Sequence, residues 1–324
     1  MNYHLLSNKL KESIGLATTL SELLLNNQRN LGTSPSEIDL LRVTLYRRTI
    51  LISEAISKLL PVSKTENFSF TSIASLTRVL VESYRPFYYL TTIENIKDEE
   101  RDFRYLVFEV YLLIERRNMI EAIRNGNQHP DLQTELVESK QKIINHPYYK
   151  FLRDTKNSEH IYRKLVQSIE DTKKDGPKKN KEFSKGFMDI LGKGCFKNDQ
   201  TILLERLATY EINEPFSDEE KKMMGNRFDK FLNKLMSNYV HSSAFAISME
   251  NDSNFQLNQE AEVYLNPMIS CCIFYLITAT HDLLKLCQLS QNNDLIQECE
   301  KAEEGALVFL SILRGRCTSV ETNP

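Results

Sequence analysis

The sequence has no tryptophan and few of the residues that end helices or form tight turns, with 10 glycines and 9 prolines in 324 residues. This scarcity argues against a β-sandwich, which needs many turns, and favours long helices. The 41% of hydrophobic and 26% of charged residues are typical of a soluble globular protein, not of a disordered or fibrous one. The length allows one large domain or two medium ones.

Positively and negatively charged residues are also present in nearly equal number. The formal net charge is -3, so no basic field over the whole molecule would attract nucleic acid, and any RNA contact has to be local. The patterns GxxxxGK[ST], HExxH and GxSxG do not occur, which removes the common phosphate-loop, zinc-protease and serine-hydrolase signatures. The cysteines and histidines show no zinc-type spacing. We therefore expect neither a cofactor nor a metal site.

The six cysteines show no CxxC spacing, and four of them fall in apolar helical sequence, where free thiols behave as small core residues. A reducing cytoplasm is the simpler compartment for such thiols. No charged residue occurs between Val263 and Thr280, but polar residues interrupt this stretch and no cluster of lysine or arginine flanks it. A buried helix is therefore favoured over a membrane span.

Apolar residues recur at helical spacing along most of the chain, and no internal repeat or convincing strand is found. The sequence predicts an all-α fold, a bundle of about nine helices, whose first helix covers residues 3–27. A capping box at Ser217 opens a long helix toward Met249. We expect a single helical domain over residues 1–324, with a charged helical subdomain or insertion at 130–215 around the lysine-rich sequence KKDGPKKNK.

Arg78, Glu82 and Arg85 share one face of a predicted helix that is otherwise apolar. One interpretation is a polar stripe that lines a binding cleft, with Glu82 held ionised by the arginines. The other is a structural ion pair or a solvated face. Glu109 is the lone acid in the apolar sequence YLVFEVYLLI, so burial would require a partner, and Arg78 or Arg85 is the natural one.

Ser237 and His241 form a second pair, spaced four residues apart in SNYVHSSAF. A hydroxyl one turn before a histidine can orient the imidazole for proton transfer. A hydrogen-bonded core histidine is the alternative.

Residues 76–90 (LTRVLVESYRPFYYL), followed much later by SNYVHSS, resemble an uncharacterised bacterial all-helical family with an early Arg-x-x-x-Glu and a late Ser-x-x-x-His pair. The resemblance covers most of residues 40 to 285. It implies a helical fold in which Arg78, Glu82, Ser237 and His241 converge, and it implies no reaction.

The sequence Arg124-Asn125-Gly126-Asn127-Gln128-His129 resembles the Arg-Asn-x-x-x-His signature of HEPN ribonucleases, helical proteins of bacterial toxin and phage-defence systems. That resemblance implies a homodimer in which Arg124 and His129 of two protomers meet and cleave RNA without a metal. Arginine would stabilise the negative charge of the phosphorane and histidine would move a proton. A polar loop between helices is the alternative.

Two hypotheses follow from the sequence. The first is a HEPN-like, metal-independent RNase of bacterial defence or toxin biology, with Arg124 and His129, or else His241, as catalytic residues. The second is a non-enzymatic sensor or scaffold, with Arg78, Glu82, Glu109 and His241 in a buried structural network. RNA, a second copy of the chain or the product of a neighbouring gene are the expected partners, and a membrane is not.

Overall fold

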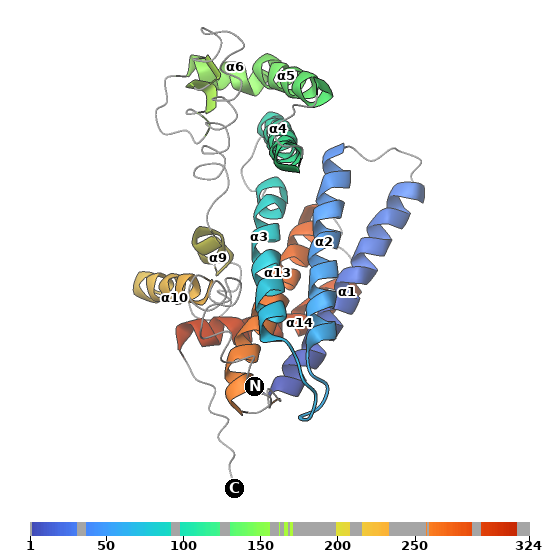
Figure 1. The fold of residues 1–324 in the computed structure, drawn as a ribbon, viewed down its shortest axis with the longest axis vertical. Coiled ribbons are helices and arrows are strands. Elements are labelled where there is room, and N and C mark those ends of the chain that lie inside the picture. The colour runs from blue at the N-terminus through green and yellow to red at the C-terminus, as the bar shows by residue number, and fades with distance from the viewer. Residues whose placement is uncertain are drawn as a thin grey trace. The chain divides into compact units, whose positions relative to one another are not determined.

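The computed structural model describes most of the helices of the chain. The described residues are 2–30, 37–91, 98–123, 130–155, 162, 165–167, 169–170, 199–207, 216–232, 257, 259–286 and 293–315. Helix dominates these residues and no strand occurs among them, which confirms the all-α prediction. Figure 1 shows the elements and their labels.

Within the described ranges, ten helices have assigned bounds, against about nine expected. They are α1 (Tyr3–Asn30), α2 (Glu37–Leu59), α3 (Phe70–Thr91), α4 (Asp98–Ile123), α5 (Pro130–Asn145), α6 (Pro147–Asp154), α9 (Asp199–Leu207), α10 (Asp218–Lys230), α13 (Gln259–Leu286) and α14 (Asn293–Arg314).

The chain divides into two compact units. Unit 1 comprises Met1–Thr91 and Asp199–Pro324, and unit 2 comprises Thr92–Asn198. Unit 2 is therefore an insertion in the sequence of unit 1, between α3 and α9. It begins and ends earlier in the chain than the charged subdomain expected at 130–215.

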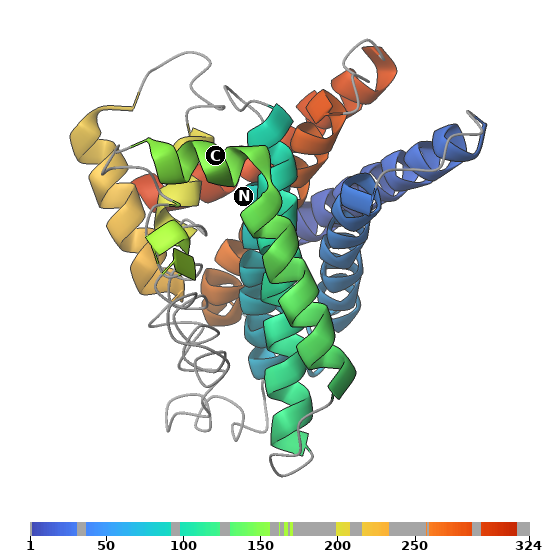
Figure 2. The ribbon, with the colours of Figure 1, turned by 90° about the horizontal axis from the view of Figure 1, so that it is seen from above.

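α13 forms the core of unit 1. It packs against α1, α2, α3 and α14, and Figures 1 and 2 show these long helices side by side. Of the helices in the described ranges, α13 alone is long and apolar enough to cross a membrane, over Ala261–Leu286. The core helix of a globular unit meets the same criteria, and 78% of the most apolar window of α13 is buried inside the protein.

Local sequence signals explain where helices begin. The predicted capping box is present at α10, where the Ser217 hydroxyl accepts from the backbone N–H of Glu220 and the Glu220 carboxylate accepts from that of Ser217. α6 is absent from the predicted helices, although His146 caps it and Pro147 occupies its first turn. Pro86 lies inside α3, which continues to Thr91.

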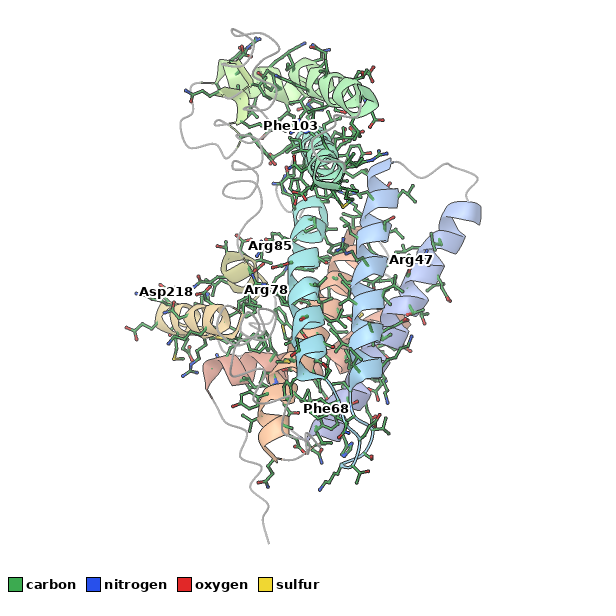
Figure 3. All side chains as sticks on the ribbon, viewed as in Figure 1. Arg47, Phe68, Arg78, Arg85, Phe103 and Asp218 are labelled. Carbon is green, nitrogen blue, oxygen red and sulfur yellow. The ribbon has the colours of Figure 1, made fainter. Side chains whose placement is uncertain are left out.

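Unit 2 is built on α4, which packs against α5 and α6. Phe103 of α4, labelled in Figure 3, is fully buried and its ring lies against those of Tyr148 and Tyr162, with centroids 5.4 and 5.2 Å away. The apolar sequence of α4 predicts a helix at the centre of a bundle. However, Leu112 in that sequence is exposed, so the helix is not enclosed on all sides.

Candidate functional site

Polar side chains of α3, α9 and α13 form two groups of hydrogen bonds and ion pairs in unit 1, one at each end of α9, and we name the two groups together the α9 network. Its members are Tyr84, Arg85 and Tyr88 of α3, Asp199, Glu205 and Arg206 of α9, and Asp282 of α13.

The sequence of α9 explains why the network forms. Asp199, Ile202, Leu203 and Arg206 recur at the helical spacing of three and four residues, so they share one face. Ile202 and Leu203 are buried in the middle of that face. The charged residues at its two ends are thereby carried toward the core, where each requires a partner.

Arg85 is the partner at the first end of α9. Its guanidinium donates from Nε and Nη2 to the two carboxylate oxygens of Asp199, a bidentate ion pair. The Asp199 side chain is 9% exposed and that of Arg85 is 35% exposed. Asp199 opens α9, where the helix dipole also favours a negative charge. The hydrogen bond to Asp199 raises the pKa of Arg85.

Asp282 is the partner at the other end. Its Oδ2 accepts from the Tyr84 hydroxyl at 2.9 Å and from Nη2 of Arg206 at 2.6 Å. The carboxylate and the guanidinium are both largely buried. Burial, and next the Asp282 charge, raise the pKa of Tyr84 well above its usual value, so the phenol stays protonated and acts as a donor.

Tyr88 closes the network around Arg206. The guanidinium carbon of Arg206 lies 4.5 Å from the centroid of the Tyr88 ring, within the range of a cation–π interaction. The Tyr88 hydroxyl donates to the carboxylate of Glu205. α9 is thus held to α3 and α13 by polar contacts at both of its ends. It also packs on α10, where Gly225 leaves room for the Gln200 side chain.

Two further titratable groups lie next to the network. The Tyr275 hydroxyl is buried and accepts or donates no hydrogen bond within the described structure. Burial, followed by the charges of Cys271 and Asp199, raises its pKa well above the usual value. Nε2 of His281 lies 3.2 Å from Oε1 of Glu303 on α14.

His281 is uncharged at neutral pH. Burial lowers its pKa to about 4, and the cations Lys285 and Arg206 act in the same direction. The contact with Glu303 is therefore not an ion pair at neutral pH, although its 3.2 Å distance would suit one if the imidazole were protonated.

In the α9 network, arginines balance the negative charges of the buried carboxylates. Arg85 neutralises Asp199 and Arg206 neutralises Asp282, while the tyrosines are protonated donors. In the described ranges, no group of three or more histidine, cysteine, aspartate or glutamate side chains is placed to hold a metal ion. Such an arrangement stabilises helix packing and fixes the position of α9.

The predicted Arg78–Glu82 pair forms, with Nε of Arg78 2.7 Å from Oε1 of Glu82. Arg78 also donates from Nη1 to the carbonyl of Leu232, just beyond the end of α10, at 3.1 Å. The Glu82 side chain is 47% exposed, so this pair lies at the surface of unit 1. Figure 3 shows Arg78 and Arg85 on the side of α3 that faces α9 and α10.

Of the remaining predicted residues, Glu109 alone lies within the described structure. Glu109 is half-buried in unit 2, and the arginines proposed as its partners bond to Glu82 and Asp199. Ser237 and His241 lie outside the described residues. So do Arg124 and His129, between the end of α4 and the start of α5.

Arg85 is the one member of the α9 network that the sequence pattern identifies; its partner Asp199 and the other members leave weaker signals. Asp199 carries one recognisable signal, an acid at the first position of a helix. Asp282 follows the uncharged stretch of α13 directly, and a charge at the end of a buried helix requires a partner. No protein-family model, curated protein or solved structure matches this chain.

Proposed function

We propose that this protein is a non-enzymatic helical scaffold or sensor, in which unit 1 is the rigid part and unit 2 is an inserted part. The observation that carries the proposal is that the two buried carboxylates of the α9 network, Asp199 and Asp282, are each paired with an arginine, while the exposed Glu205 accepts from Tyr88. Each buried carboxylate accepts from an arginine, so the network contains no general base or nucleophile left unpaired by its neighbours.

The place of α9 in the chain also supports a scaffold. α3 is the last helix before unit 2 and α9 is the first helix after it. Arg42 binds the C-terminal end of α3 by donating from Nε and Nη2 to the carbonyl of Leu90, at 2.9 and 2.7 Å. The two helices at which the insertion leaves and rejoins unit 1 are therefore both held by arginines, α3 by the buried Arg42 and α9 by the partly exposed Arg85 and the largely buried Arg206.

The reducing compartment expected from the sequence belongs to the same proposal. Cys271, Cys272 and Cys299 are buried free thiols in the helical core. A cytoplasmic location fits this chemistry, and the setting in bacterial phage defence rests on the sequence resemblance alone. As a scaffold or sensor, it would act through a partner protein.

The alternative proposal is the HEPN-like RNase. It is favoured by the Arg-Asn-x-x-x-His sequence from Arg124 to His129. In that case unit 2 would carry the reaction and unit 1 would carry none.

An RNA-cleavage assay on purified protein separates the two proposals. The scaffold proposal predicts that RNA remains intact with the wild-type chain at the same level as with His129→Ala and with His241→Ala. If RNA cleavage is lost in His129→Ala but kept in a folded Asp199→Asn variant, the scaffold proposal is wrong and the RNase proposal takes its place. Cleavage lost only in His241→Ala would place the reaction in unit 1.

A further inference from the structure

α4 carries an exposed apolar stripe. Leu112, Met119 and Ile123 are 44%, 61% and 74% exposed, and their spacing of seven and four residues places them on one face. Within unit 2, α4 packs against α5 and α6. Buried Phe103 and Val110 lie on the opposite face, whereas buried Phe108, one turn before Leu112, lies on the same side as the stripe, which therefore begins at Leu112. Three large apolar side chains in one line differ from the singly scattered ones that any surface has.

The charges beside this stripe are divided between its edges. Glu115 is exposed and lies along one edge, while Arg116 lies along the other. Arg116 is 61% exposed, and its described ion-pair distance is a long 3.9 Å to Glu135 of α5. Glu109 is on the same edge as Arg116, but it is half-buried and lies about two turns away, before the stripe begins. The Arg116 guanidinium is therefore available to a second acid.

We propose that this stripe is the interface between two copies of the chain, with the two α4 helices side by side and parallel. In a parallel pair the acidic edge of one helix meets the basic edge of the other, so Arg116 of each copy faces Glu115 of the second copy. An antiparallel pair would bring like edges together, acid beside acid and arginine beside arginine, which is repulsive. A stripe whose two edges complement each other is suited to a twofold, isologous contact.

The interface is small. One helix pair buries less surface than the roughly 1,600 Å² of a standard protein–protein interface. We therefore expect a dimer that dissociates on dilution. This inference concerns unit 2 and stands whether or not the α9 network has the scaffold role proposed above.

Sedimentation equilibrium of the full chain over roughly 1 to 100 µM, a range that spans the affinity of a weak contact, tests the proposal. We expect a monomer–dimer equilibrium whose association constant falls by about tenfold or more in Met119→Glu. The matched control is Leu51→Glu, because Leu51 of α2 is 63% exposed, nearly the same as Met119. That control should leave the association constant unchanged, and circular dichroism checks that both variants fold.

Charge exchange tests the orientation. Glu115→Arg and Arg116→Glu should each weaken the dimer several-fold, and the double variant should restore it, because the complementary edges are then exchanged. A chain that stays monomeric at about 100 µM would overturn the proposal, and so would a dimer that Met119→Glu does not weaken. Absence of rescue in the double variant would overturn the parallel arrangement.

Discussion

Two ion pairs on α3 lie about two turns apart and illustrate different uses of the same chemistry. Arg78 pairs with Glu82 within the helix, and Arg85 pairs with Asp199 of another helix. The carboxylate is 47% exposed in the first pair and 9% exposed in the second. Water therefore solvates Glu82 when its arginine is removed, whereas Asp199 would keep little solvation.

The difference shows which polar residues hold unit 1 together. The sequence predicts the Arg78–Glu82 pair as a candidate site because the two residues are spaced four apart and share one face of a predicted helix. Arg85, on the same face, makes the contact that joins helices distant in the chain. Burial, and not the presence of an ion pair, sets how much the free energy of unfolding falls when one partner is removed.

The largest expected effect comes from removing the buried acid. Asp199→Ala should lower the free energy of unfolding by about 3 kcal/mol, at the lower end of the range for breaking a buried pair, because Arg85 is partly exposed and regains some water. Urea denaturation followed by circular dichroism measures this. Asp199→Asn is the control, since it keeps the volume and one acceptor oxygen and should cost less. A loss below about 1 kcal/mol in Asp199→Ala would remove the distinction between the two pairs.

His281, next to Asp282 in the sequence, extends the comparison to a neutral buried group. Its pKa in the folded protein is about 4, below the value of about 6.5 in an unfolded chain. Protons therefore bind the unfolded state more strongly, and the free energy of unfolding should fall as the pH is lowered from 6.5 to 4. We expect a loss of about 2 kcal/mol over this window, allowing for partial exposure.

Urea denaturation at several pH values between about 7.5 and about 4 measures that dependence. His281→Gln is the control, because it removes the titrating group and should flatten this part of the profile. An unchanged slope in His281→Gln would show that His281 is not the group responsible.

Most helices of this fold can be predicted from the sequence. Periodicity placed α1 over residues 3–27 against Tyr3–Asn30 in the structure, and the capping box placed the start of α10. α6 was missed because its eight residues give little periodicity, although His146 and Pro147 mark its start. The long uncharged stretch correctly identified the buried core helix, α13.

The contacts of the α9 network cannot be predicted from sequence periodicity in the same way. Arg85 stood out on its helix face, but Asp199 follows 114 residues later, after the whole of unit 2. A pairing over that separation leaves no local pattern, and Glu82, one turn from Arg85, was the nearer candidate. Tertiary contacts decide such pairings, whereas periodicity records only which side of a helix is buried.

The smallest effect is expected at the exposed pair. Glu82→Ala should change the free energy of unfolding by about 0.5 kcal/mol or less, as for other exposed pairs four residues apart in a helix. Arg78 keeps its hydrogen bond to the Leu232 carbonyl in this variant, so its guanidinium is still held. The change should also shrink as salt is added, since an exposed pair is screened.

The same denaturation experiment, run beside Asp199→Ala, makes the contrast quantitative. We expect the loss in the free energy of unfolding to be several times larger in Asp199→Ala than in Glu82→Ala, because the two acids differ mainly in their exposure to solvent. If Glu82→Ala were as destabilising as Asp199→Ala, then the exposed Arg78–Glu82 pair would be as important for folding as the buried Arg85–Asp199 pair. In that case the polar residues of α3 would have to be treated as one cooperative unit instead of an exposed pair and a buried one.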